Sequence, residues 1–221
     1  MKIAYNRMST VIEIVPGKCF GLIIENEQFL YQMLTDFKQA TEGIETGIVV
    51  SKREQPEDVS KKVAFLTDFV GFDLNRKSLL SKIVSTLESN AKEARLCQTS
   101  QRLLADIENF ISELTLDFPY ELSCEKLSMQ NLLKCAGVAI VDDFSSLEER
   151  LLAYMDLARE FEGKELFIFA NLRCLISAEK LQRMIETALM REHNILLIDG
   201  FDYPKLEEES RMVVDKDLCE I

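Results

Sequence analysis

The sequence is poor in the residues that interrupt regular structure. Its 221 residues include 8 Gly, 4 Pro and no Trp, and 47% of them are apolar. This composition excludes a disordered, collagen-like or low-complexity chain. The longest apolar stretches are six or seven residues, whereas a membrane helix needs roughly 20. Because no signal peptide is apparent either, we expect a soluble cytoplasmic protein with no membrane segment.

Cysteine pairs with metal-binding spacing are also missing. The six cysteines lie at least eleven positions apart: Cys19, Cys97, Cys124, Cys135, Cys174 and Cys219. Without a CxxC pair, the sequence offers no template for a zinc site or for dithiol exchange. Free cysteines of an intracellular protein behave as small apolar residues, so we expect these six to be buried.

The charge balance excludes a uniformly basic surface. Lys and Arg number 26 and Asp and Glu 38, which gives a net charge of -12. Such a chain repels phosphate polymers on average. Between residues 48 and 95, however, there are nine cations and seven anions, while the rest of the chain has 17 and 31. This difference fits either a local basic surface or scattered solubilising lysines.

The period of the apolar residues divides the chain into three regions. From Val11 to Leu74, short β-branched and aromatic runs separated by Gly and Pro predict strands. One amphipathic helix interrupts them, because apolar residues between Phe29 and Phe37 recur at three and four positions. The next region is helical and contains hardly any Gly or Pro, and the remainder returns to strand, helix and strand.

Four helices are predicted in the middle region from their apolar stripes and end signals. Asn75 is placed to cap the first helix. The third covers residues 125–136 and ends at Gly137, a good C-terminal cap. Ser146 precedes Glu149 by three residues, which is the spacing of a capping box at the start of the fourth helix.

The last region predicts a parallel pair of strands. Leu166–Ala170 and Ile195–Ile198 are continuously apolar, which is typical of strands buried on both faces. The helical stripe between them suits a right-handed crossover. We therefore predict an α/β fold with a parallel-containing sheet. Its head covers residues 1–74 and 163–221, and an extended α-helical leg is inserted over residues 75–162.

Polar residues follow three of the predicted strands: Asp68, Asn171 and Asp199. Ligands of parallel α/β sheets bind at the carboxyl ends of the strands. A nucleotide-dependent phosphotransferase or hydrolase using Asp68 or Asp199 is therefore one alternative. No GxxxxGK[ST] or GxGxxG motif is present, so the head is a degenerate nucleotide-binding-like fold without a P-loop. The simpler interpretation is that these side chains face solvent.

The single histidine lies in no catalytic motif. His193 follows a helical stripe and precedes a strand, with no Ser or Cys motif near it. The C-terminus of a helix tolerates its charge. We therefore interpret His193 as a cap or surface residue.

Carboxylates recur every four residues around Pro119. In a helix, Glu113, Asp117, Glu121 and Glu125 would share one face and repel one another. Calcium relieves such repulsion because it accepts oxygen ligands at flexible geometry. No EF-hand loop is present, and a solvated acidic face is the alternative.

Several segments, taken in order, resemble a known family. They are LTDFVGFDLN at 66–75, LLKCAGV at 132–138, KELFIFAN at 164–171, ILLID at 195–199 and VVDKD at 213–217. Together they cover roughly residues 60 to 221. The chain is similar to the ring-forming adaptation protein of type II-A CRISPR loci, the Csn-two family.

The resemblance implies a function. Members of the family have an α/β head and a helical leg and form a homotetrameric ring that threads onto the ends of double-stranded DNA. They require calcium, lack nuclease activity, and work in spacer acquisition for antiviral defence with the CRISPR integrase complex and the RNA-guided nuclease of the same locus. A ring can keep its exterior acidic and its bore basic, so phosphate contacts inside would bind duplex without sequence preference.

We assign site residues from this resemblance together with the cations of the 48–95 window. The expected DNA-binding residues are Lys52, Arg53, Lys61, Lys62, Arg76 and Lys77. Lys52 and Arg53 fall near the family's bore lysines, which follow its third strand. The expected calcium ligands are Asp117, Glu121 and Glu125, although an intervening acidic position of the family is Ser123 here. Besides the enzyme, a structural partner-binding scaffold remains an alternative.

Overall fold

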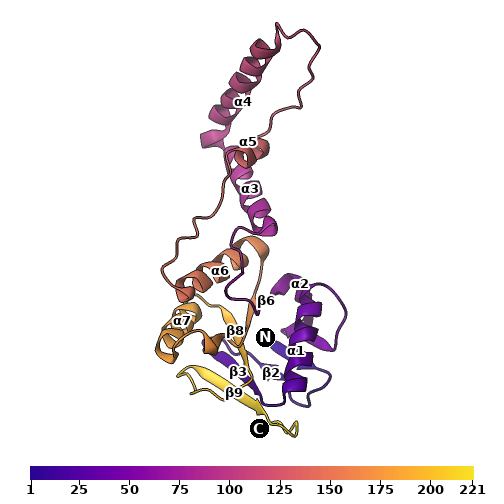
Figure 1. Ribbon diagram of the computed structural model, residues 1–221, viewed down its shortest axis with the longest axis vertical. Coiled ribbons are helices and arrows are strands. Elements are labelled where there is room, and N and C mark those ends of the chain that lie inside the picture. Colours follow the sequence, from indigo (N-terminus) through magenta and orange to yellow (C-terminus); the bar gives the residue numbers. More distant parts are fainter. The chain divides into compact units, whose positions relative to one another are not determined.

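The computed structural model describes all residues, Met1–Ile221, which form two compact units (Figure 1). Unit 1 comprises Met1–Phe72 and Asp142–Ile221, and unit 2 comprises Asp73–Val141. Unit 2 is thus a single insertion between the two halves of unit 1. No helix is both long enough and apolar enough to cross a membrane.

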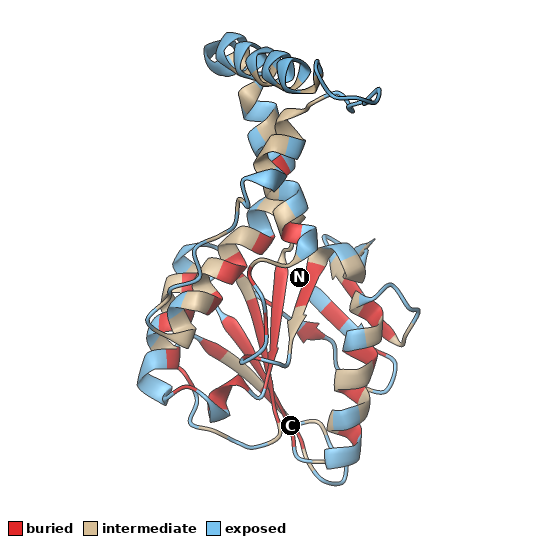
Figure 2. Ribbon diagram, turned by 45° about the horizontal axis from the view of Figure 1, so that its top comes forward, coloured by how far each residue is buried: buried red, intermediate tan, exposed pale blue.

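A five-stranded parallel sheet forms the centre of unit 1. Its order is β6 (Val63–Leu66), β7 (Leu166–Ala170), β8 (Asn194–Asp199), β3 (Cys19–Ile24) and β9 (Glu209–Val214). Every neighbouring pair is parallel. The mixed α/β class with a parallel sheet is confirmed, as is the pairing of the two apolar runs as β7 and β8. All residues of β3 and β7 are buried (Figure 2).

A second, antiparallel sheet also belongs to unit 1. Its order is β2 (Ile12–Glu13), β1 (Lys2–Tyr5), β4 (Ile48–Lys52) and β5 (Gln55–Glu57). Helix α1 (Glu27–Thr41) contacts β3 and β6 of the first sheet and β4 of the second. Its buried residues Phe29, Met33 and Phe37 follow the predicted helical period.

Helices α6 (Leu147–Glu162) and α7 (Ala178–Met190) pack together in unit 1, and the short 3-10 helix η1 (Leu172–Cys174) follows β7. The predicted capping box of α6 is confirmed: Ser146 accepts from the backbone N–H of Glu149, whose carboxylate accepts from Ser145. The sequence pattern assigns α6 to the inserted leg, whereas the structure places it in unit 1. The reason is its apolar face, where the Tyr154 ring contacts those of Phe72 and Phe167.

Unit 2 consists of α3 (Lys77–Ala91), α4 (Ala94–Thr115) and α5 (Met129–Cys135), with α3 in contact with both others. The prediction that Asn75 caps α3 is wrong. Its side chain instead donates to the carbonyl of Ile140 and accepts from the N–H of Ile140, which ties together the two ends of the insertion. Helix α5 begins at Met129, after Ser128 as its N-cap, rather than at residue 125.

The expectation of buried cysteines is wrong for most of them. Only Cys19 is buried; Cys97 is half-buried and the other four are exposed. Cys19 lies in the central strand β3, whereas Cys174 and Cys219 follow the carboxyl ends of strands. The remaining three belong to unit 2, where α4 has no buried residue at all.

Helix α2 and the residues around it complete the part of unit 1 in which the candidate site lies. Helix α2 (Val59–Lys62) is one turn long and is capped by Asp58, whose carboxylate accepts from the N–H of Ser60. It leads directly into β6. Because β6 and β7 pair in parallel from Val63 opposite Leu166, the residues just before these strands become neighbours.

Candidate nucleic-acid interface

Four of the six predicted DNA-binding residues come from two adjoining segments of unit 1. Lys52 is the last residue of β4, and Arg53 lies in the two-residue turn to β5. Arg53 and Glu54 both have positive φ, 52° and 63°, as a type I′ hairpin turn requires. Lys61 and Lys62 are the last two residues of α2.

A single carboxylate joins these two segments. Glu165 binds Lys52 through Oε2 and Lys62 through Oε1, each at 2.5 Å. The sheet register explains the contact with Lys62, because Glu165 precedes β7 as Lys62 precedes β6, and the N–H of Glu165 donates to the carbonyl of Lys62 at 2.8 Å. Lys52 reaches the same carboxylate from the end of β4. Two cations ten positions apart in the chain therefore converge on one point.

The ionisation of this cluster reflects its ion pairs. The hydrogen bonds from Lys52 and Lys62 hold the pKa of Glu165 below its usual value. The hydrogen bond to Glu165 in turn raises the pKa of Lys62. Both shifts favour the charged forms of Glu165 and Lys62. Lys61 forms a separate pair with Asp58 at 3.1 Å and remains largely exposed.

The other two predicted DNA-binding residues belong to unit 2. Arg76 is the N-cap position of α3 and Lys77 its first residue. The six predicted residues are thus divided between the two units, and the structure brings only Lys52 and Lys62 to one point. The role of all six as DNA contacts stays a prediction.

A cavity of about 650 Å³ lies beside this cluster, at the amino ends of β6, β7 and β8. Besides Lys52 and Lys62, its basic lining residues are Arg159 and Lys164. Sequence reasoning missed both. The position of Lys164 two residues before the apolar run of β7 was the available signal, whereas Arg159 reaches the cavity through the packing of α6.

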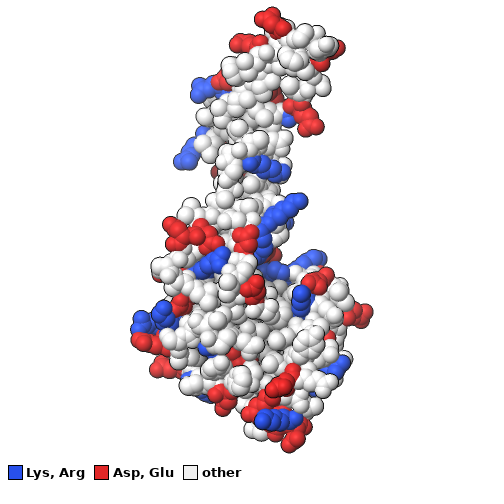
Figure 3. Space-filling view, viewed as in Figure 1, with Lys and Arg blue, Asp and Glu red and all other residues white.

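The surface of unit 1 is mixed in charge rather than broadly basic. Figure 3 shows Lys and Arg interspersed with Asp and Glu over the visible face of this unit. Close to the cluster, for example, Glu54, Glu57 and Asp58 accompany the cations. The cluster is therefore a local feature on an acidic protein.

Asp68 and Asn171, both polar residues at the carboxyl edge of the parallel sheet, accept hydrogen bonds from backbone N–H groups. The Asp68 carboxylate accepts from the backbone N–H groups of Val70 and Gly71 at 3.0 and 2.8 Å. Asn171 has a left-handed backbone conformation, and its side chain accepts from the N–H of Gly200 at 3.2 Å. Asp68 thus stabilises the turn after β6, and Asn171 links the ends of β7 and β8.

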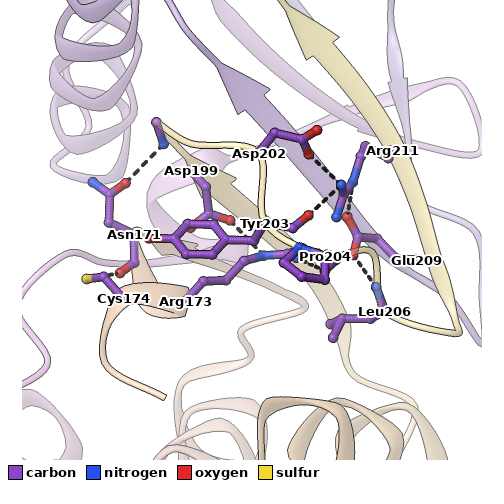
Figure 4. Close-up of polar contacts among 11 residues, drawn as sticks. Asn171, Arg173, Cys174, Asp199, Asp202, Tyr203, Pro204, Leu206, Glu209 and Arg211 are labelled. Carbon is purple, nitrogen blue, oxygen red and sulfur yellow. Dashed lines mark hydrogen bonds and ion pairs between the residues drawn. The ribbon is translucent and has the colours of Figure 1, made fainter. Parts of the chain in front are cut away.

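Asp199 lies in a buried ionic network (Figure 4). Its carboxylate is 2.9 Å from Nε of Arg173, whose Nη2 is 2.8 Å from Glu209. Glu209 also binds Arg211 at 2.7 Å, and Arg211 binds Asp202. The expectation that Asp199 faces solvent is wrong, because its side chain is 1% exposed. Burial raises the pKa of Asp199 to about 6, although Arg173 opposes the shift.

The network also accounts for a glycine in the central strand. A Cβ at Gly21 would lie 2.1 Å from Oε1 of Glu209. Only glycine leaves room there for the Glu209 carboxylate. The connection from β3 to α1 consists of Glu25 and Asn26 alone, which is too short for a phosphate-binding loop.

His193 is buried, so its interpretation as a surface residue is wrong. Its Nε2 lies 2.8 Å from Oδ1 of Asp156, and its ring meets that of Phe167 edge-on at 5.3 Å. Burial holds the pKa of His193 below its ordinary value. It lines the cavity at the amino edge.

The predicted calcium ligands lie beyond α4, which ends at Thr115. Asp117, Glu121 and Glu125 are exposed and lie in an irregular segment, so the helical face of four carboxylates does not form. No group of three or more His, Cys, Asp or Glu side chains is positioned to hold a metal ion within this one chain. Calcium binding stays a prediction.

The fold and this site define a class of protein: an α/β domain without a P-loop, with a helical insertion and cations gathered at the amino edge of its parallel sheet. The family model described as CRISPR-associated protein (Cas_Csn2) matches residues 43–218. This match covers well over half of the chain. The chain therefore belongs to the Csn2 family of CRISPR-associated proteins, as the resemblance to type II-A adaptation proteins predicted.

Individual relatives are distant. The CRISPR-associated protein Csn2 of Enterococcus faecalis is 22% identical over 135 residues, which are 61% of this chain and 62% of that protein. Csn2 of Streptococcus agalactiae is 21% identical over 157 residues, 71% of this chain and 70% of that protein. The chain thus spans about three fifths of the length of the first relative.

Among solved structures, the chain is similar to a Pyrococcus furiosus protein provisionally named as the ATP-binding protein of an ABC transporter. The identity is 12% and the TM-score 0.40, with 95% of this chain and 93% of that chain covered. A superposition this loose supports no functional conclusion.

Proposed function

We propose that this protein serves CRISPR spacer acquisition as a non-enzymatic, sequence-independent binder of double-stranded DNA ends. In this proposal it acts as a homotetrameric ring, stabilised by calcium, that threads onto linear duplex. Its partners are the CRISPR integrase complex and the RNA-guided nuclease of the same locus. Membership in the Csn2 family supports the general role.

The observation that carries the proposal is the convergence of Lys52 and Lys62 on Glu165. Two ammonium groups held this close together form a preset site for a phosphate oxygen, which would replace the Glu165 carboxylate as their partner. Arg53 and Lys61 flank them on the same two segments. Contacts of this kind fix a duplex by its backbone and do not depend on base sequence.

Self-assembly is supported by the unpartnered face of α4. This 22-residue helix has no buried residue, and Leu103, Phe110 and Leu114 on it are 45, 58 and 65% exposed. An amphipathic helix of this length gains most of its stability from packing of its apolar face. A second copy of the chain would supply that packing.

The absence of enzymatic activity is supported by the engagement of the two candidate carboxylates. Asp68 accepts two backbone hydrogen bonds of its own turn. Asp199 is buried against Arg173. Asp199 is therefore not available to bind a magnesium nucleotide or to activate water in this arrangement, and one carboxylate oxygen of Asp68 is engaged by its own turn.

The salt dependence of duplex binding tests the assignment. Each phosphate contact that is lost should reduce the slope of log K against log[salt] by about 0.9. We therefore expect the slope for the double variant Lys52→Gln/Lys62→Gln to be smaller in magnitude by close to two. Its affinity should fall by the same factor for every duplex sequence. The control Lys180→Gln/Lys216→Gln, which removes the same charge outside the cluster, should retain the slope. An unchanged slope for the first variant would refute the assignment.

A further inference from the structure

The cavity at the amino edge of the parallel sheet has features that duplex binding alone does not use. Its volume of about 650 Å³ lies within the range of small-molecule sites, about 300–1,000 Å³. Four basic side chains line it, Lys52, Lys62, Arg159 and Lys164, against the two carboxylates Glu165 and Glu192. In a chain with a net charge of -12, this is a local excess of positive charge.

A buried, partly unsatisfied histidine belongs to the same lining. The side chain of His193 is 1% exposed, and its Nδ1 has no hydrogen-bond partner. Because Nε2 contacts the carboxylate of Asp156, Nε2 carries the proton and the neutral ring leaves Nδ1 as a bare acceptor. A second proton on Nδ1 would turn it into a donor that requires an anion.

The basic groups differ in how firmly they are held. Lys164 donates to the carbonyls of Ser60 and Val63 and thus helps to hold the wall of the cavity. Arg159 donates to the carbonyl of Arg191, and its pair with Glu192 is loose at 3.6 Å, with Glu192 84% exposed. Arg159 can therefore exchange this carboxylate for a ligand at little cost.

The shape of the site selects among phosphates. An internal phosphodiester is flanked by sugars on both sides, so a duplex presents it only to a surface. A terminal phosphate is free on one side, can enter a recess, and carries between 1.5 and 2 negative charges near neutral pH, as phosphate monoesters do. The cavity adjoins Lys52 and Lys62, which are also proposed to contact the duplex.

We propose that this cavity binds a phosphate monoester, which on DNA is the terminal phosphate of a strand, through Lys52, Lys62 and Arg159, and that the buried ring of His193 behind them responds to the bound charge. The DNA part of this proposal rests on the proposed function. The cavity then distinguishes phosphorylated from unphosphorylated ends, a selectivity that backbone contacts alone do not provide. Arg159 is the residue that binds here and not in general duplex binding, and His193 reports the binding.

The single histidine of the chain provides the readout. Because His193 is the only one, its imidazole nitrogen resonances need no assignment. The probes are deoxyadenosine 5′-monophosphate, deoxyadenosine, and a blunt duplex with or without 5′-phosphates. We expect the monophosphate and the phosphorylated duplex to shift the His193 resonances and to raise the pKa of His193. The bound dianion stabilises the imidazolium, as Asp156 does, and opposes the lowering of the pKa by Arg159 and Arg191. Deoxyadenosine should leave the resonances unchanged.

Affinity measurements provide the second readout. The phosphorylated duplex should bind roughly tenfold more tightly than the unphosphorylated one, the effect of a charge-assisted contact. Arg159→Gln should abolish this preference and retain the binding of unphosphorylated duplex. The control Arg183→Gln removes an exposed arginine that pairs only with Glu179 on α7, and it should retain the preference. Thermal unfolding of both variants verifies that they are folded.

Each outcome decides between the two proposals. Equal affinity for the two duplexes with an unchanged His193 signal would overturn the cavity proposal and leave duplex binding standing. A preference that survives in Arg159→Gln would also overturn the cavity assignment. If neither duplex binds but the monophosphate shifts His193, the cavity proposal holds and the proposed function fails. If nothing binds and His193 does not respond, both fail.

Discussion

At the scale of single residues, the arrangement around Glu165 sets the charge available to a ligand. This carboxylate neutralises part of the charge of Lys52 and Lys62 and also holds the two side chains together. It therefore competes with any phosphate for both lysines. The two ion pairs of Glu165 contribute little to the free energy of unfolding, because their side chains are partly exposed.

We expect Glu165→Gln to strengthen duplex binding. The glutamine keeps the size of the side chain and removes the competing charge, so both lysines become available to phosphate. Affinity should rise several-fold at low salt, and the salt dependence should steepen because more counterions are released. Fluorescence anisotropy over a salt series measures this. Weaker binding would indicate that Glu165 acts chiefly by positioning the lysines.

Gly21 is a residue where the fold tolerates little change. In Gly21→Ala the new methyl group would displace the carboxylate of Glu209 from the buried network. We expect a loss of roughly 2–4 kcal/mol in the free energy of unfolding, from overpacking and a disturbed buried ion pair. Urea unfolding measures it. In the Glu209→Ala background the same change should cost much less; equal costs in both backgrounds would show that the two sites are independent.

Because of Asp199, we expect the free energy of unfolding to decrease as the pH rises. Its pKa is about 6 in the folded protein against an ordinary value of 3.8. Between these values the folded state holds a proton that the unfolded chain has lost, so this group's contribution to stability falls as the pH rises through about 6. Compared with the native protein, Asp199→Asn should therefore lose less stability between pH 4.5 and pH 7. If the free energies of unfolding of the two proteins change in parallel over that pH range, the assignment is contradicted.

At the scale of secondary-structure elements, local signals predicted those elements whose stability is local. The apolar runs of β7 and β8 and the capping box of α6 were predicted because pattern and packing agree there. Asn75 was misassigned, since its amide found a better partner in the distant Ile140. The predicted helical face of carboxylates does not form because α4 ends four residues before Pro119.

The candidate site was only partly predictable for the same reason. The charge window between residues 48 and 95 contains Lys52 and Lys62, but their partner Glu165 lies more than 100 positions away. The parallel register of β6 and β7 places Glu165 beside Lys62, whereas Lys52 comes from β4 of the antiparallel sheet. The burial of His193 was equally invisible, since it depends on Asp156 of α6 and Phe167 of β7.

The exposed face of α4 predicts self-association through this helix. We expect Phe110→Asp to shift the protein toward smaller assemblies by adding a charge to that face, while unit 1 remains folded. The neighbouring exposed residue provides the control, because Asn109→Asp adds the same charge. Light scattering coupled to size-exclusion chromatography distinguishes the outcomes. Equal effects of both variants would indicate simple charge repulsion rather than an interface.

At the scale of the whole molecule, the acidic total and the proposed DNA binding are compatible only if the cations act as an enclosed set. A chain with a net charge of -12 should repel duplex from most of its surface. Assembly into a ring would direct the few basic clusters inward and concentrate them around one duplex. Carboxylates such as Asp117, Glu121 and Glu125 from neighbouring copies could then share calcium, although one chain alone does not gather them.

Calcium dependence is therefore expected of the assembly and not of the single chain. Chelation should reduce the assembly state and duplex binding together, and the triple variant Asp117→Asn/Glu121→Gln/Glu125→Gln should no longer respond to calcium. Sedimentation velocity with and without chelator measures the first effect. A triple variant that still assembles only with calcium would exclude these three residues as the ligands.

The most direct measurement compares binding to a covalently closed circular plasmid with binding to the same plasmid after a single cut. A ring that encloses duplex needs a free end, so we expect the cut plasmid to be bound and the closed circle to remain essentially unbound at the same salt and calcium concentrations. Equal binding of the two forms would contradict the account.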